Sequence, residues 1–216
     1  MNAVDRFVIY DDVYFIKGGW INRNRILVNG GAKYLTTPVH KQSQNSLIKD
    51  LRLLDDNVWR SKLLRMLEFS YRKAPYYESV YPILREIIGS EETNLSIYLQ
   101  TALNRLSSWL GIDTEFIVSS EKFNNNHLVG QERIIDICKA EKADIYLNLP
   151  GGMSLYDAKG FQNNSIELKF LCPLDICYRQ FDKEFAPHLS IIDVIMFNGQ
   201  SGTRKFLEDF TLENAA

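Results

Sequence analysis

The chain has little cysteine and no long apolar run. It contains three cysteines in 216 residues, too few and too scattered for a disulfide framework. Cys172 and Cys177 have no histidine beside them, so we expect buried free thiols and no metal site. No apolar run approaches the length of a membrane span, and the N-terminus lacks the basic and apolar regions of a signal peptide. We therefore expect a protein of the reducing cytoplasm that does not insert into a membrane.

An excess of charge of either sign is also missing. The formal net charge is -2, so the composition provides no general attraction to nucleic acid or to anionic membranes. Any anion binding must therefore come from local clusters. With 45% hydrophobic and 24% charged residues the chain can bury a core, and neither a repeat nor a linker divides it. We predict a single domain over residues 1–216.

Strand and hairpin patterns open the chain, and helical spacing follows. Arg6–Tyr10 is rich in β-branched and aromatic residues, which is typical of a buried strand. Arg25–Val28 and Lys33–Val39 flank an Asn-Gly-Gly turn and predict an antiparallel hairpin. Apolar residues then recur at helical spacing. The predicted helices are a first one from Asp56 that Pro75 ends, then Tyr76–Ile88 and Asn94–Leu110.

Strands and helices alternate in the second half of the chain. The predicted strands are Glu115–Val118, Asp144–Leu149 and Ile166–Leu171, and the predicted helices are Gly130–Lys142 and Leu189–Phe197. Such alternation favours a parallel sheet that is covered by helices. The predicted fold is therefore α/β: a layered fold with a mainly parallel Rossmann-like sheet, an N-terminal antiparallel hairpin and a helical middle section.

Polar or glycine pairs follow three of the predicted strands, either directly or after a single proline. In chain order they are Asp11 with Asp12, Ser119 with Ser120, and Gly151 with Gly152. Ligands of open α/β sheets bind outside the carboxyl ends of the strands. We therefore expect these pairs to line a shared cleft.

The Asp11–Asp12 pair has two interpretations. It can form a turn with a capping acid, or it can present a carboxylate that binds a hydroxyl, an amine or a metal. Neighbouring residues of an extended segment point in opposite directions, so only one carboxylate would face the cleft. The sequence leaves open which of the two it is.

A basic segment that includes a tryptophan comes next. Its candidate ligand-binding residues are Lys17, Trp20, Asn22, Arg23, Asn24 and Arg25. On an extended segment Arg23 and Arg25 share one face, and paired guanidinium groups suit a phosphate or a carboxylate. Trp20 can stack on a base or a sugar. The alternative is a surface strand edge that is protected by charge.

Further candidates lie later in the chain. Glu132 is in the first turn of a predicted helix, where an acid also simply complements the helix dipole. Gly151 and Gly152 would let the backbone approach a phosphate, although their spacing matches no known phosphate loop. His188 is a candidate general base. Ser190 fits a helix N-cap better than a nucleophile, so we predict no Ser/His/Asp triad.

Several stretches resemble the WbqC-like proteins. The block DRFVIYDDVYFIKGGWINRNRIL is similar to the family's leading pattern, which joins Asp-Asp to Trp-x-Asn-Arg-Asn-Arg. WRSKLLRMLEFSYRKAPYY is similar to a family helix that ends in Tyr-x-Lys-x-Pro-Tyr. LGIDTEFIVSSE, ERIIDICKAEKADIYLNLPGG and HLSIIDVIMFNG resemble later family blocks in the same order. The resemblance therefore covers nearly the whole chain.

Two features depart from the family pattern. Members usually begin with a strand and a Gln-Pro-x-Tyr-x-Pro-x-x-Gly-Tyr segment, whereas this chain begins at Met1, inside what would be the following helix. Tyr14 also stands where the family often has Gln. If the N-terminal segment lines the cleft, we expect a chain without it to fold and yet be inactive.

The resemblance implies a role in surface-polysaccharide (O-antigen) biosynthesis and glycine transfer to an amino sugar. The leading hypothesis is a cytoplasmic glycyl- or acyltransferase that acts on a nucleotide-linked amino sugar. Asp11, Asp12 or His188 would act as the base, while Arg23 and Arg25 hold phosphate.

The acyl donor stays open between a charged tRNA, an adenylate and a thioester, and no cofactor is specified. A charged tRNA would be the only nucleic-acid partner. The alternative is a non-catalytic module that binds a sugar nucleotide or assists polysaccharide assembly. The fold would also allow ATP-dependent ligation, which no motif demands.

Overall fold

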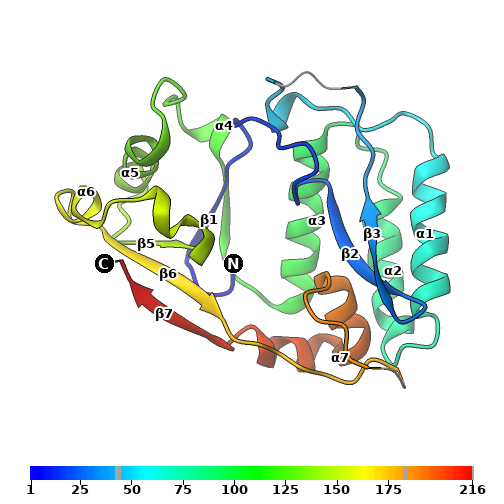
Figure 1. The fold of residues 1–216 in the computed structure, drawn as a ribbon. Coiled ribbons are helices and arrows are strands. Elements are labelled where there is room, and N and C mark those ends of the chain that lie inside the picture. Colours follow the sequence, from blue (N-terminus) through cyan, green and yellow to red (C-terminus); the bar gives the residue numbers. More distant parts are fainter. Residues whose placement is uncertain (42–44, 182–183, 216) are drawn as a thin grey trace.

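In the computed structural model, which describes residues 1–41, 45–181 and 184–215, helices fill one side of the molecule and most strands the other (Figure 1). The helical part also contains the hairpin. Its elements are β2 (Arg23–Val28), β3 (Gly31–Thr36), the short helix η1 (Ile48–Asp50), α1 (Val58–Tyr71), α2 (Tyr77–Ile88), α3 (Leu95–Leu110) and α7 (Ile191–Phe206). Trp59, Leu63 and Leu67 of α1 are buried in its core, which confirms the helical spacing.

The hairpin turns at two residues, Asn29 and Gly30, whose φ angles of 55° and 82° lie in the left-handed region. Asn and Gly tolerate this region, and such a turn matches the twist of the paired strands. The antiparallel hairpin is thus confirmed. Its second strand was predicted to run to Val39 but stops at Thr36, because Pro38 has no N–H for the ladder.

The strand-rich part consists of short strands with small helices around them. Its elements are β1 (Arg6–Ile9), β4 (Glu115–Val118), α4 (Ser119–Lys122), α5 (Gly130–Ala140), β5 (Ile145–Asn148), η2 (Pro150–Leu155), α6 (Ala158–Gln162), β6 (Glu167–Pro173) and β7 (Phe210–Asn214). β1 is parallel to β4 and β5 is parallel to β6, whereas β7 runs antiparallel to β6. The mixed α/β class is confirmed. Hydrogen bonds group the described strands into three small sheets, where the prediction had one mainly parallel sheet.

The C-terminal helix differs most from its prediction, which ended at Phe197. α7 continues to Phe206 through a kink at Gly199, whose φ is 63°. A Cβ atom at Gly199 would lie 2.5 Å from the ring of Tyr76, so the close approach requires glycine. β7 was not predicted at all. No helix within the described ranges is long and apolar enough to span a membrane.

Candidate functional site

A cavity of about 470 Å³ opens where β1 ends and α5 begins. Its wall combines buried charges, tyrosines and apolar side chains. The lining residues are Tyr10, Asp12, Val13, Tyr14, Leu47, Asn126, Leu128, Val129, Gly130, Arg133, Ile134 and Tyr156. The volume falls in the range of small-molecule sites, and the N-terminus of α5 lies in the wall. Backbone N–H groups and the helix dipole favour an anionic ligand group at such an end.

A buried ion pair forms the polar centre of this cavity. Arg133 Nη2 lies 2.5 Å from Asp12 Oδ2, and both side chains are at most 5% exposed. The second carboxylate oxygen, Asp12 Oδ1, is buried and has no hydrogen-bond partner among the described residues. Buried polar atoms are nearly always hydrogen-bonded. Asp12 Oδ1 therefore keeps acceptor capacity that no described group uses.

Side chains from the loop before α5 and from the residue after β1 orient Arg133. Its Nε donates to Asn125 Oδ1 at 3.0 Å, and Asn125 Nδ2 in turn donates to Asp136 Oδ2 at 2.8 Å. The guanidinium lies over the ring of Tyr10, 4.7 Å from its centroid. Burial raises the pKa of Tyr10, and the charge of Arg133 opposes this shift. Tyr10 consequently stays a neutral phenol at the edge of the site.

Asp11 does not share the surroundings of Asp12. Its carboxylate accepts hydrogen bonds from Ser96 Oγ at 3.1 Å, from Ser120 N at 3.0 Å and from Ser120 Oγ at 2.8 Å. The two predicted pairs at the ends of β1 and β4 therefore do meet, through Asp11 and Ser120. Ser119 is fully buried, and its Oγ has no partner within the described part of the chain. Both carboxylate oxygens of Asp11 are bonded, so its visible role is to join α3 and α4.

Glu132 and the glycine pair do not belong to the cavity lining. Glu132 is exposed, next to the buried Arg133 on α5. Gly151 has open space around its α-carbon, whereas Gly152 is buried against Asn148. A Cβ atom at Gly152 would lie 2.5 Å from Asn148 Nδ2, so a larger residue there would have to displace the Asn148 side chain.

The basic segment forms a cluster of its own on the hairpin. Arg23 donates to the carbonyl groups of Gly18 and Gly19 and lies over the ring of Tyr34 at 4.4 Å. The guanidinium of Arg25 is 5.6 Å from the ring centre of Trp20. Asn22 donates to the carbonyl of Thr37, the Asn24 side chain accepts from the next backbone N–H, and Lys17 is exposed. None of these residues lines the cavity described above.

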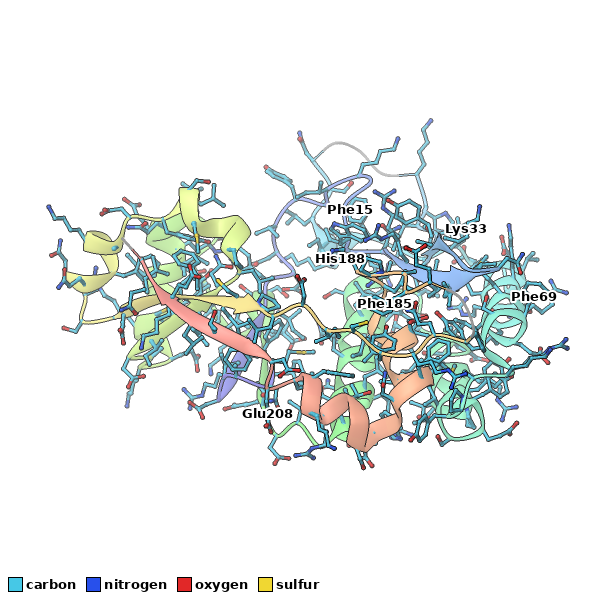
Figure 2. All side chains as sticks on the ribbon, turned by 60° about the horizontal axis from the view of Figure 1, so that its bottom comes forward. Phe15, Lys33, Phe69, Phe185, His188 and Glu208 are labelled. Atoms are coloured by element: carbon cyan, nitrogen blue, oxygen red, sulfur yellow. The ribbon has the colours of Figure 1, made fainter. Side chains whose placement is uncertain are left out.

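His188 lies beside this hairpin cluster, on the segment before α7 (Figure 2). Its side chain is exposed, and its carbonyl oxygen accepts a hydrogen bond of 2.8 Å from Arg25 Nη2. Ser190 Oγ accepts from the backbone N–H of Ile192 at 3.2 Å, which confirms Ser190 as the N-cap of α7. His188 is outside the lining of the cavity at Asp12.

Sequence reasoning missed Arg133, Tyr10 and Tyr156 as site residues. A signal for Arg133 was present, because it falls on the apolar stripe of α5 with Ile137, one turn further along. A charged residue on an apolar helix face needs a buried partner. The partner, Asp12, is 121 residues away, and no local pattern identifies it.

The cysteines differ in their surroundings. Cys138 is buried, and burial raises its pKa to about 11. Cys172 is partly exposed and Cys177 is exposed, so the expectation of buried thiols was wrong for these two. The described residues contain no group of three or more His, Cys, Asp and Glu side chains that could hold a metal ion.

Comparison with known proteins identifies relatives of the chain. The model of the WbqC-like protein family matches residues 1–205. The chain is 32% identical over 199 residues to the "Uncharacterized protein Rv1507c" of Mycobacterium tuberculosis. The matched region covers 90% of this chain and 84% of that relative. No solved structure matches the chain.

Proposed function

Because the chain belongs to the WbqC-like protein family, we propose that it is a transferase that passes a glycyl or other acyl group to the amine of a nucleotide-linked amino sugar. The product would be an amide used in surface-polysaccharide biosynthesis. The single observation behind this proposal is Asp12, a buried carboxylate in the cavity wall with one oxygen that no described residue bonds. The parallel pairs β1–β4 and β5–β6 support a Rossmann-like layer behind it.

In the proposed reaction the sugar amine attacks the carbonyl carbon of the acyl donor. The new C–N bond forms and the bond from the carbonyl carbon to the leaving group breaks. Asp12 Oδ1 takes a proton from the attacking nitrogen and passes it to the leaving group. Arg133 holds Asp12 in place through the other carboxylate oxygen. The N-terminus of α5 would receive a phosphate of the sugar nucleotide.

A non-catalytic sugar-nucleotide binding module is the second candidate. The same ion pair favours it, since a buried carboxylate that is bound to Arg133 at 2.5 Å can serve structure alone. Both candidates use the same cavity. They differ in whether Asp12 must accept a proton.

The first experiment is a thermal-shift panel of amino-sugar nucleotides, free nucleotides, ATP and glycine. A ligand at a hundred times its Kd adds about 2.7 kcal/mol of stability, which is about 5–10 °C for a chain of this length. Val129→Asp, at an exposed position in the cavity wall, should abolish the shift by repelling phosphate. Leu155→Asp, at a similarly exposed position outside the lining, is the matched control. Absence of a shift with every ligand would rule out the sugar-nucleotide cavity.

Turnover then separates the two candidates. With the ligand found and glycyl-tRNA, glycyl adenylate and a glycyl thioester as donors, mass spectrometry detects the amide. We expect Asp12→Asn to keep ligand binding and to lower turnover by about 10²–10⁴-fold. Asp55→Asn changes an exposed carboxylate and should have no effect. Equal turnover in Asp12→Asn and the unaltered chain would contradict the role of Asp12, whereas binding without turnover for any donor would favour the module.

A further inference from the structure

The charges of the chain are unevenly distributed along it. The whole sequence has 25 basic and 27 acidic residues, whereas the stretch 13–49 contains no Asp or Glu at all. Its basic residues are Lys17, Arg23, Arg25, Lys33, Lys41 and Lys49. This stretch includes the hairpin and the loop before it, so a local positive region belongs to a molecule of net charge -2.

Large apolar side chains are exposed in the same stretch. Ile16 and Trp20 leave 67% and 58% of their surface to solvent, and Tyr14 and Tyr34 are also more than half exposed. Phe15, between two of them, is buried in the core below. One side of this loop therefore anchors it to the protein, while the other presents an aliphatic and an aromatic surface.

The exposed loop is held in one conformation. The backbone N–H of Gly19 donates to the carbonyl of Ile16 at 3.0 Å and closes a turn around Lys17 and Gly18. The guanidinium of Arg23 donates hydrogen bonds to the carbonyl groups of Gly18 and Gly19. The rings of Trp20 and Tyr34 lie 6.2 Å apart, so they form one patch.

We propose that this docking face, made of the loop Tyr14–Trp20 and of Tyr34, binds the surface of an anionic lipid bilayer. Trp and Tyr favour the headgroup region, an exposed Ile can enter the acyl boundary, and Lys17 attracts acidic headgroups. An acidic polysaccharide or a nucleic acid would use the rings and cations, but it gives no reason for an exposed Ile16 at the turn. The protein lies on the bilayer through this face and does not span it.

The docking face also has a position relative to the cavity. Tyr14 belongs to the loop and lines the cavity that contains Asp12. Docking through the loop would hold the cavity mouth close to the membrane, within reach of a substrate or product at the headgroups. The inference stands on the loop alone and needs no catalytic activity.

Vesicle sedimentation tests the proposal with the full chain. Vesicles are made of phosphatidylcholine alone, or of phosphatidylcholine mixed with phosphatidylglycerol. We expect binding to the mixed vesicles and a blue shift of fluorescence, because Trp20 is the most exposed of the three tryptophans, whereas Trp59 is buried and Trp109 is half-buried. Lys17→Gln should weaken binding about fivefold, the effect of one cation near an anionic surface. Ile16→Ser should weaken it about tenfold through lost apolar burial.

Matched controls come from the strand-rich part. Lys139→Gln removes an exposed cation of α5 and Leu212→Ser removes an exposed aliphatic side chain of β7, and neither should alter vesicle binding. Unchanged melting temperatures of Lys17→Gln and Ile16→Ser show that both variants are folded. The proposal is overturned if the mixed vesicles do not sediment the protein, or if the controls weaken binding equally. It is also overturned if Ile16→Ser binds normally. The exposed aliphatic side chain would then play no part, and a water-soluble anionic polymer such as dextran sulfate would fit the loop equally well.

Discussion

At the scale of single residues, Asp193 is the most deeply buried acid of the described chain. It is fully buried in α7 and accepts hydrogen bonds from Tyr71 Oη, Tyr178 Oη and Gln180 Nε2 at 2.6–2.7 Å. Tyr71 Oη also accepts from the backbone N–H of Leu27, so the network links α1, α7 and β2. Burial raises the pKa of Asp193, and the three donors only partly offset this.

We expect Asp193→Asn to lower the free energy of unfolding by about 1–3 kcal/mol, because one buried donor loses its acceptor. The loss should be largest at low pH. Because the pKa of Asp193 is raised in the folded state, its contribution to the free energy of unfolding is complete below the ordinary pKa of 3.8. That contribution is lost as the pH rises through the folded-state pKa. Urea denaturation of both proteins at about pH 4 and about pH 8 measures the difference. A loss that grows with pH would show that the donors outweigh burial.

Asn94 acts at the scale of an element, because it caps the N-terminus of α3 and also ties this helix to η1. Its Oδ1 accepts from the backbone N–H of Ile97 at 3.1 Å, and its Nδ2 donates to the carbonyl of Lys49 at 2.6 Å. Asn94→Asp keeps the acceptor and loses the donor, whereas Asn94→Ala loses both. The two contributions can therefore be measured separately.

We expect Asn94→Ala to lower the free energy of unfolding by about 1–2 kcal/mol through loss of the cap and by about 1 kcal/mol through loss of the hydrogen bond to Lys49. Asn94→Asp should cost only the second amount, partly offset by the dipole of α3. Midpoints of urea denaturation give both values. If the two variants were equally destabilised, the cap would contribute nothing and α3 would depend on packing alone.

At the scale of the whole molecule, Asp11 connects the two parts. It follows β1 and accepts from Ser96 of α3 and from Ser120 of α4. We expect Asp11→Ala to leave the Ser120 N–H without its acceptor and to cost about 1.5–3 kcal/mol. Hydrogen exchange should speed up at the start of α4 and of α3 together. Asp55→Ala, which removes an exposed carboxylate, should change neither; faster exchange in only one helix would show that Asp11 does not couple the parts.

Much of the fold was predictable because short-range preferences act within a few residues. Gly111 ends α3 in the left-handed conformation that glycine favours, and the Asn29–Gly30 turn sets the hairpin register. The predicted β4 has the observed bounds. Gly199 shows where this fails: a polar run after Phe197 ends the apolar pattern, yet the chain turns helical again after a non-helical kink at Gly199, which packs against Tyr76.

The sequence by itself determined the type of most of the longer elements, the cap of α7 at Ser190 and the meeting of the Asp11 and Ser120 pairs after parallel strands. Only the tertiary structure decided that Asp12 and Arg133 form one buried pair, and that Arg23 and Arg25 bond backbone carbonyl groups of neighbouring segments. Hydrophobic periodicity and backbone preferences act between residues that are only a few positions apart in the sequence. The pairing of charges 121 residues apart depends instead on how whole elements pack, because a charge can be buried only where its partner is brought to meet it.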